Sequence, residues 1–168
     1  ICGTTGWLDD YEKIVEFSKK TNTSFLYSSN YSLGVNLFFD LNKKLAKLIS
    51  SHKDYELKIS ETHHTEKLDK PSGTAITIAE DIINNSKYLS WTFAKNNSSE
   101  IEIESLRKAN VPGTHVVTYS SEIDSIEIKH SAHNRKGFAL GAVVAAEWII
   151  DKKGVFNMSD VIKDPNLN

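Results

Sequence analysis

Helix-like and strand-like segments alternate along the first half of the chain, and this alternation restricts the fold more than any other feature of the sequence. The clearest helix is residues 32–51, SLGVNLFFDLNKKLAKLISS, where apolar residues recur every three or four positions and lysines fill the other face. Ser32 is its expected N-cap, and the predicted apolar stripe is Val35, Phe38, Leu41, Leu45, Leu48 and Ile49. It is preceded by a strand end at Ile1-Cys2, a helix over residues 9–20 capped by an aspartate, and a strand over residues 24–28. This order is typical of a parallel α/β sheet.

The segments after residue 55 predict further strands and two more helices. YELKISETHH predicts a strand that ends at two histidines, and PSGTAITIAEDIINNS predicts a helix from about Ser72 to Asn84. EIEIESLR, THVVTYSS and DSIEIKHS each alternate with period two and are joined by polar turns. We expect these three segments to be neighbouring strands of a mixed or antiparallel sheet with one covered face. The apolar run from Phe138 to Ile150 is expected to be a buried helix.

Composition excludes several classes of protein. The 20 Lys and Arg residues face 22 Asp and Glu residues, so bulk positive charge for nucleic-acid binding is absent. Cys2 is the only cysteine, which excludes a disulfide framework and a cysteine-rich zinc site and fits a reducing cytoplasm. No apolar run reaches the length of a membrane span. We therefore expect a cytoplasmic protein with neither nucleic-acid nor membrane partners.

The stretch ETHHTEKLDKPSGTA, residues 61–75, concentrates proton carriers and anion-binding groups. His63 and His64 end the predicted strand, and Lys67 follows as a cation and a second possible proton donor. The residues Ser72-Gly73-Thr74 stand where a helix begins, and the free N–H groups of a helix start bind anions. A small dianionic substrate that must be protonated fits these groups.

A metal site is the competing interpretation of the same residues. Neighbouring residues of a strand point to opposite faces, so His63 and His64 are a poor pair of ligands for one metal. No histidine or carboxylate follows at the helical spacing of a zincin. We expect no metal site, and we interpret His52, His115 and His130 as ordinary hydrogen-bonded histidines. A serine N-cap alone would also explain the sequence PSGT.

With these residues in view, the chain resembles the dihydrodipicolinate reductase family, the 4-hydroxy-tetrahydrodipicolinate reductases. Residues 61–75 match the family pattern E-x-H-H-x-x-K-x-D-x-P-S-G-T-A throughout. CGTTGW is similar to the family's second cofactor loop, SSNYSLGVN to its entry into the substrate domain, and VPGTHVV and IEIKHSAHNRKGFALGAV to its later strands and helix.

The resemblance implies an α/β fold that combines a remnant of a Rossmann-type parallel sheet domain with an α+β substrate and oligomerisation domain containing a mixed sheet. Residues 1–31 would be the remaining part of the dinucleotide-binding domain. Residues 32–134 would be the substrate-binding and tetramerisation domain, and residues 135–168 would return to the dinucleotide-binding domain. The opening ICGTTGW lacks an initiator methionine and is typical of a strand end entering a turn, so we expect a fragment.

The resemblance also implies an activity: NAD(P)H-dependent reduction of 4-hydroxy-tetrahydrodipicolinate to tetrahydrodipicolinate, in lysine and diaminopimelate biosynthesis, by a homotetramer. By matching positions, His63 would be a proton donor and acceptor, and Lys67 the donor beside it. The substrate, a small dicarboxylate, would be held by His64, Ser72, Gly73 and Thr74. The cofactor, NADH or NADPH, would be bound by Gly3, Thr4, Thr5, Ser28, Ser29, Asn30 and Tyr31.

Two alternatives remain open at the level of sequence. The family begins with a strand and a G-x-G-x-x-G loop that this sequence does not contain, so the chain could be a catalytically inert substrate-binding and oligomerisation fragment. A saturable nicotinamide fluorescence signal would favour the enzyme over the inert fragment. The second alternative is a metal-dependent hydrolase that uses His63 and His64, which elemental analysis of protein purified without chelator would reveal.

Overall fold

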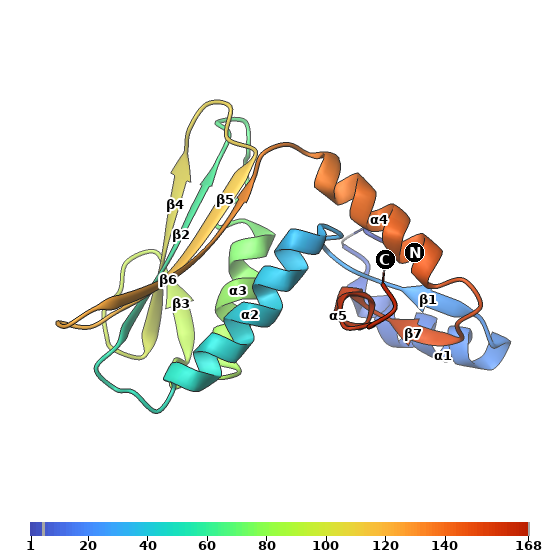
Figure 1. The fold of residues 1–168 in the computed structure, drawn as a ribbon, viewed down its shortest axis with the longest axis horizontal. Coiled ribbons are helices and arrows are strands. Elements are labelled where there is room, and N and C mark those ends of the chain that lie inside the picture. The colour runs from blue at the N-terminus through green and yellow to red at the C-terminus, as the bar shows by residue number, and fades with distance from the viewer. Residues whose placement is uncertain (5, 168) are drawn as a thin grey trace. The chain divides into compact units, whose positions relative to one another are not determined.

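The computed structural model describes residues 1–4 and 6–167, which form two compact units (Figure 1). The first unit comprises Ile1–Leu37 and Arg135–Asn168, and the second comprises Phe38–Asn134. Helix α2, Leu33–Ile49, contributes its first turn to one unit and the remainder to the other. The sequence boundary expected after residue 31 therefore falls a few residues before the structural one. The dinucleotide-binding and substrate-binding roles assigned to these parts stay predictions.

The first unit contains a two-stranded parallel sheet with helices around it. Strand β1, Ser24–Leu26, pairs with β7, Gly154–Phe156, and a parallel bridge between Cys2 and Tyr27 extends the same arrangement. The other elements are the 3-10 helix η1 (Leu8–Asp10), α1 (Tyr11–Thr21), α4 (Lys136–Trp148) and α5 (Met158–Ile162). The core of this unit is formed by Leu26, Tyr31, Ala145, Met158 and Val161.

In the first unit one expectation is wrong and one strand was not predicted. The apolar run at Phe138–Ile150 is not a buried helix: in α4 only Gly141 and Ala145 are buried, and Leu140 and Val143 are exposed, because the helix packs within its unit through one narrow face. Strand β7 was not predicted, since a three-residue pairing leaves no periodicity in the sequence. Among the described residues, no helix has the length and apolar character needed to cross a membrane.

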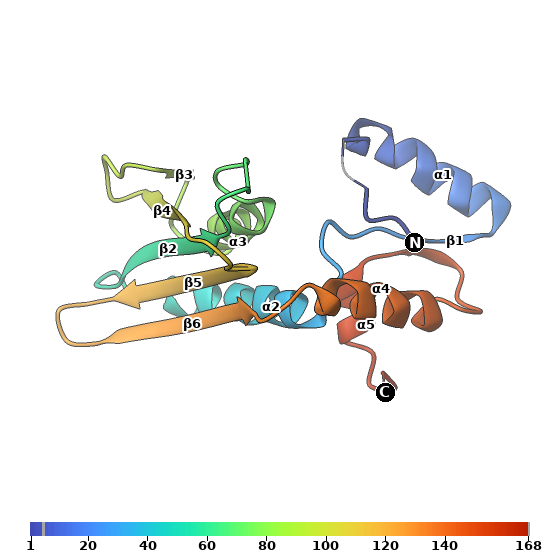
Figure 2. The same cartoon turned by 90° about the horizontal axis from the view of Figure 1, so that it is seen from above.

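The second unit is a five-stranded mixed sheet with two helices on one face (Figures 1 and 2). Its strands lie in the order β3-β4-β2-β5-β6, with β3, β4 and β2 parallel and β5 and β6 antiparallel to their neighbours. Their bounds are β2 (Glu56–His63), β3 (Ser90–Thr92), β4 (Glu100–Arg107), β5 (Gly113–Ser120) and β6 (Ser125–Ala132). The covering helices are α2 and α3, Gly73–Ile83. The prediction of an α/β fold with a parallel and a mixed sheet is confirmed.

Helix α2 buries a stripe that matches the predicted one in part, since Val35, Phe38 and Ile49 are buried as expected. Its buried residues are Val35, Asn36, Phe38, Phe39, Asn42, Ala46 and Ile49. Leu41 and Leu48 are 50% and 70% exposed, so their place in the predicted stripe is wrong. The sequence misleads because the polar Asn42 lies in the interface, where its side-chain amide donates a hydrogen bond of 3.2 Å to the carbonyl of Ile78 on α3. A buried polar side chain with such a partner can occupy a core position.

The core face of β2 changes character along the strand, and this change places the polar site. Leu57 and Ile59 lie in the apolar core, whereas Glu61 and His63 continue the same face with ionisable groups. The sheet register sets Glu61 opposite Ser105 of β4 and His115 of β5, and sets His63 opposite Arg107. Several polar side chains are therefore gathered at one end of three adjacent strands.

Replacement of Ile78 by alanine should lower the free energy of unfolding by about 2–5 kcal/mol, because the side chain is fully buried between α3 and the sheet and its loss leaves a cavity. Leu48→Ala on the exposed face of α2 is the matched control and should change it by less than about 0.5 kcal/mol. Urea unfolding followed by circular dichroism measures both. Equal losses in the two variants would contradict the described orientation of the helices.

Candidate functional site

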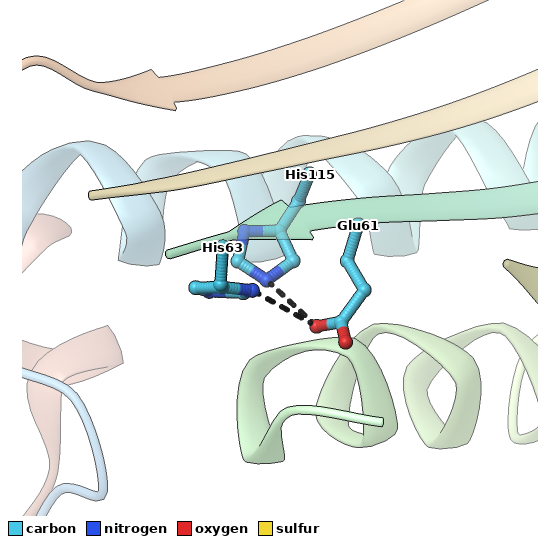
Figure 3. A group of neighbouring side chains, drawn as sticks. All are labelled: Glu61, His63 and His115. Atoms are coloured by element: carbon cyan, nitrogen blue, oxygen red, sulfur yellow. Dashed lines mark ion pairs between the residues drawn. The ribbon is translucent and has the colours of Figure 1, made fainter. Parts of the chain in front are cut away.

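The buried carboxylate of Glu61 is the centre of the polar site (Figure 3). Glu61 is 0% exposed, and its two carboxylate oxygens accept the backbone N–H of Ser72 at 3.2 and 3.1 Å. The guanidinium Nη1 of Arg107 donates to Oε1 at 3.2 Å. Burial alone would raise the pKa of Glu61, but donors from His63 and Ser72 outweigh it and hold the pKa of this carboxyl well below its usual range. The site thus contains a fixed negative charge.

Two buried histidines from adjacent strands face this carboxylate. His63 Nδ1 lies 3.4 Å and His115 Nε2 lies 3.8 Å from Glu61 Oε2, and the two rings meet edge to face with centroids 5.0 Å apart. Gly113 of β5 lies against His63, because a Cβ built at this glycine would be only 3.1 Å from His63 Nε2. The missing side chain at Gly113 therefore makes room for the imidazole.

His115 connects the carboxylate to the start of α3. Its Nε2 is 3.1 Å from Ser72 Oγ, and Ser72 Oγ accepts the N–H of Ala75 at 3.2 Å, which confirms Ser72 as the N-cap of the helix. Burial, together with the nearby charge of His63, lowers the pKa of His115 to about 3. His115 is consequently a neutral hydrogen-bonding group at physiological pH.

The first turn of α3 offers backbone N–H groups beside this network. The first N–H groups of a helix have no partner within the helix, and they carry the positive end of its dipole. Gly73 is exposed and Thr74 half-buried, and a Cβ at Gly73 would meet no atom within 4 Å. Ser72 itself is buried, so its hydroxyl serves the cap and His115. The open backbone at Gly73 is where an anion can approach the helix.

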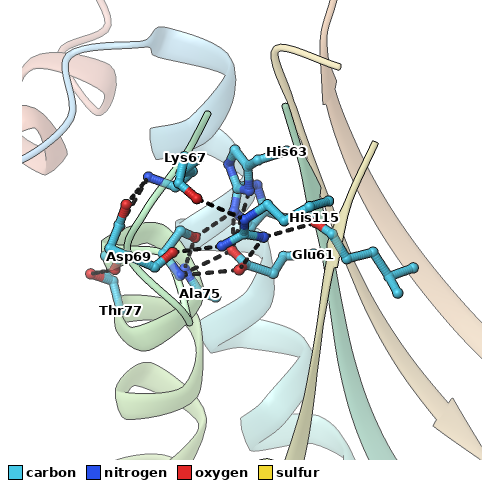
Figure 4. A network of polar contacts seen from close by, with 11 residues as sticks. Glu61, His63, Lys67, Asp69, Ala75, Thr77 and His115 are labelled. Carbon is cyan, nitrogen blue, oxygen red and sulfur yellow. Dashed lines mark hydrogen bonds and ion pairs between the residues drawn. The ribbon is translucent and has the colours of Figure 1, made fainter. Parts of the chain in front are cut away.

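Lys67 lies on the loop between β2 and α3, next to this helix start (Figure 4). Its ammonium group pairs with the carboxylate of Asp69 at 2.7 and 2.9 Å, and this hydrogen bond lowers the pKa of Asp69. The guanidinium of Arg107 binds the same loop through its backbone: Nε donates to the Lys67 carbonyl at 3.2 Å and Nη2 to the Asp69 carbonyl at 2.5 Å. Glu61, Arg107 and the loop thus form one connected network.

The second unit brings five of the six residues predicted for proton transfer and substrate binding close to one another. His63 and Ser72 are tied to Glu61, while Lys67, Gly73 and Thr74 lie on the loop and the helix turn around it. His64 follows at the end of β2 and is half-buried, with its Nδ1 away from solvent and without a hydrogen-bond partner among the described residues. Whether these residues act in proton transfer and substrate binding stays a prediction.

The residues predicted to bind the cofactor lie in the first unit, on two loops. Tyr31 is buried, and its hydroxyl donates to the carbonyls of Cys2 and Leu26 at 2.8 and 3.2 Å. The Asn30 side chain accepts the N–H of Ser32, and the Ser28 hydroxyl donates to the Asn30 carbonyl. These three side chains shape the loop from within, whereas Gly3, Thr4 and Ser29 are exposed. Thr5 lies outside the described residues.

Glu61, Arg107 and His115 were not predicted as site residues. The signal for Glu61 was its position two residues before His63 on a strand, which places both side chains on one face. Arg107 and His115 had no comparable signal, since their approach depends on pairing between segments more than forty residues apart. The interpretation of His115 as a hydrogen-bonded histidine holds, but it missed that the residue belongs to this network.

Glu61, His63 and His115 also have the residue types and spacing of a metal site, with ligand atoms all within 4.8 Å of one another. The sequence argument against a metal concerned His63 with His64 and did not consider this group. The carboxylate already receives a guanidinium at 3.2 Å and a backbone N–H. A metal ion here would have to share Glu61 with the positive charge of Arg107, which disfavours it.

Residues 34–162 match the family model described as dihydrodipicolinate reductase, C-terminus. The chain is 56% identical over 165 residues to the 4-hydroxy-tetrahydrodipicolinate reductase of Christiangramia forsetii, covering 98% of this chain and 69% of the relative. It is 38% identical over 179 residues to the enzyme of the same name from Buchnera aphidicola subsp. Schizaphis graminum, covering 98% of this chain and 63% of that one.

Among solved structures, the chain is similar to dipicolinate-bound dihydrodipicolinate reductase from Paenisporosarcina sp. TG-14, with a TM-score of 0.73 and 21% identity. This likeness covers 94% of the chain and 62% of the solved one, and it supports the fold. The chain thus spans between 62% and 69% of the length of these relatives.

His115 should make the protein sensitive to acid. Its pKa is about 3 in the folded protein and near 6.5 in the unfolded chain, so between these values only the unfolded chain takes up the proton. The free energy of unfolding must then fall as the pH falls, by at most about 1.4 kcal/mol per pH unit for this one group. Urea unfolding between about pH 6 and pH 5 measures this effect together with that of His130, whose pKa burial also lowers.

The variant His115→Gln should show a flatter dependence of unfolding free energy on pH in this window. His52→Gln, at an exposed position, is the control and should keep the wild-type slope. An unchanged slope in the His115 variant would mean that this histidine is not held neutral by its surroundings.

Proposed function

The chain belongs to the dihydrodipicolinate reductase family, and we propose that it carries the substrate-binding and proton-donating groups for the NAD(P)H-dependent reduction of 4-hydroxy-tetrahydrodipicolinate to tetrahydrodipicolinate. The family membership expected from residues 61–75 is confirmed by the match over residues 34–162 and by the 56% identity to a named reductase. The observation that carries the proposal is that one carboxylate, Glu61, contacts both parts of the site. It lies beside the imidazole of His63 and accepts the N–H of Ser72 at the start of α3.

The anion-binding side suits a dicarboxylate. The amides of Gly73 and Thr74 would receive a substrate carboxylate at the open start of α3, where the helix dipole favours negative charge. His64 would hold the second carboxylate from the end of β2. Ser72 supports the cradle indirectly, because its hydroxyl caps the helix and binds His115.

His63 and Lys67 are suited to the protonation that follows hydride transfer. Once the 4-hydroxyl group has left as water, the bound nicotinamide would supply a hydride to the conjugated ring, and the electron density that builds there needs a proton. Glu61 Oε2 lies 3.4 Å from Nδ1 of His63, which leaves Nε2 as the nitrogen that would give the proton. Lys67 is the second donor, with Asp69 holding its ammonium group in the resting state.

The first unit offers groups that fit a dinucleotide. Gly3 and Thr4 directly follow Cys2, and Ser28–Tyr31 follow Tyr27, so both loops leave the carboxyl ends of two adjacent parallel strands. Open α/β sheets bind dinucleotides at such strand ends. A side chain at Gly3 would press on the ring of Tyr31, at 3.2 Å from the built Cβ, so the backbone there is closely packed. We propose NADH or NADPH as the cofactor of a Rossmann-type domain.

The remaining family properties are proposed with it: a homotetramer in the cytoplasm that serves lysine and diaminopimelate biosynthesis. The balanced charge and the single cysteine are compatible with this setting.

Lys67→Ala in the full-length protein should lower turnover by about two orders of magnitude, because a proton donor is lost. The control is Lys70→Ala, an exposed lysine of the same loop, which should retain wild-type turnover. Steady-state oxidation of the reduced nicotinamide measures both. Wild-type turnover in the Lys67 variant would remove this residue from the mechanism.

Gly73→Ala separates substrate binding from folding. The added methyl group meets no atom within 4 Å, so the stability should be unchanged or slightly higher. If a substrate carboxylate approaches the backbone at this point, the same methyl group blocks it, and the KM should rise by about tenfold or more. Gly137→Ala, in the exposed first turn of α4, should leave the KM unchanged. An unaltered KM in the Gly73 variant would place the anion site elsewhere.

A further inference from the structure

We propose that Arg107 is a positioning residue of the reduction, which fixes the loop that carries Lys67 so that its ammonium group is placed for proton donation. This inference rests on the proposed function. Arg107 is the last residue of β4 and lies opposite His63 in the sheet register. It is thus anchored on a strand while its side chain reaches across to the loop between β2 and α3.

The guanidinium of Arg107 has a polar partner on each of its three nitrogens. Nε donates to the carbonyl of Lys67 at 3.2 Å, and Nη2 donates to the carbonyl of Asp69 at 2.5 Å. Nη1 donates to Glu61 Oε1 at 3.2 Å and to the carbonyl of Leu106 at 2.8 Å. Figure 4 shows the polar network that joins Glu61 to the loop of Lys67 and Asp69. Two of its partners bracket the Lys67–Asp69 segment.

This arrangement depends on the chemistry of arginine. A planar guanidinium presents its N–H donors in a fixed fork, so it can bind two backbone carbonyls and a carboxylate at the same time. A lysine ammonium is a point charge on a flexible stem and cannot reproduce the fork. The Arg107 side chain is only 10% exposed, so water competes little for these carbonyls.

The position of Lys67 depends on how its loop is held: its backbone N–H donates to the carbonyl of His64 at 3.2 Å, and Arg107 binds its carbonyl. Leu68, between the two bracketed carbonyls, is 94% exposed, so the segment is not held by apolar packing of that residue. Among the described residues, the ammonium group of Lys67 pairs with Asp69, which lies in the same loop. Reaction rates are sensitive to such placement, since a shift of about 1 Å in a catalytic group costs about a hundredfold.

Glu61 links this loop to the helix that receives the substrate. One oxygen of its carboxylate accepts a hydrogen bond from Arg107. Both oxygens accept the N–H of Ser72, at the start of α3. The donor loop and the anion-binding turn are therefore set by one buried group. A substrate bound at Gly73 would meet Lys67 at a position that Arg107 determines.

A double-mutant cycle in the full-length protein tests the role of Arg107. Arg107→Lys keeps a positive charge beside Glu61 but removes the fork, and kcat should fall by about ten- to a hundredfold while KM changes less than about threefold. In a Lys67→Ala background the same replacement should lower kcat by less than about threefold, because its target is already gone. Lys58→Met is the control: it breaks an exposed β2–β4 ion pair with Glu102 and Glu104 and should leave both constants unchanged.

The outcomes separate this inference from the proposed function. Equal losses of kcat from Arg107→Lys with and without Lys67 would make Arg107 a structural residue and overturn the inference. Wild-type kcat in Arg107→Lys would overturn it as well, while a damaging Lys67→Ala would leave the proposed function standing. Wild-type kcat in Lys67→Ala would instead refute the role of Lys67 in the proposed function, and the inference with it.

If Arg107→Lys does not fold, Arg107→Gln replaces it in the same double-mutant cycle.

Limited trypsin digestion of the wild-type protein adds a measurement that needs no variant. Cleavage after Lys67 should be slower than cleavage after Lys95 on the loop between β3 and β4, since the first loop is held by the guanidinium. Equal or faster cleavage after Lys67 would show that its loop is not fixed and would overturn the inference.

Discussion

The ionised, fully buried carboxylate of Glu61 is the interaction on which the rest of the site depends. Removing a carboxylate from water costs several kcal/mol, and the cost is offset only when charged and hydrogen-bonding partners surround the group. Arg107 and the N–H of Ser72 provide them here. Arg107 also binds the loop that carries Lys67, and Ser72 caps the start of α3, so the need to satisfy one charge also fixes the geometry around it. Stability and the proposed function therefore rely on the same contacts.

The neutral state of His115 is part of this arrangement. An imidazolium at His115, near Arg107, would add repulsion, and burial prevents it by lowering the pKa of His115 to about 3. His115 can then act as a hydrogen-bond partner of Ser72 without changing the charge of the site. The network contains one carboxylate and one permanent cation at its centre, which leaves His63 free to carry the proton that the proposed reaction requires.

The parts of the fold that could be predicted from sequence are those set by local periodicity. The end of β2 at the histidines, the Ser72 cap, the bounds of α3 to within one residue, and the three strands β4, β5 and β6 all follow from patterns within short segments. Leu41 and Leu48 were misplaced because a polar residue, Asn42, occupies the interface of α2. Strands β3 and β7 are three residues long, too short for a periodic pattern, and they are defined by their hydrogen bonds to neighbouring strands.

The candidate site was predictable to the extent that it lies in one segment. Residues 61–75 gave His63, Lys67 and the helix start, whereas Arg107 and His115 come from strands whose register no local pattern contains. Recognition of the family supplied roles for residues in the first segment and none for these two. The missing information is therefore the pairing of β2 with its two neighbours.

That pairing has a consequence for how sequence change is tolerated. In this sheet β2 has a parallel neighbour on one side and an antiparallel neighbour on the other, so the last residues of β2 and β4 and the first residues of β5 meet at the same edge. Two short peptides, residues 61–75 and 107–115, suffice to assemble the network. The β5–β6 turn around Glu122 and Ile123 lies at the opposite end of the strands, away from the polar network. Insertions and deletions there could accumulate during divergence and leave the chemistry intact.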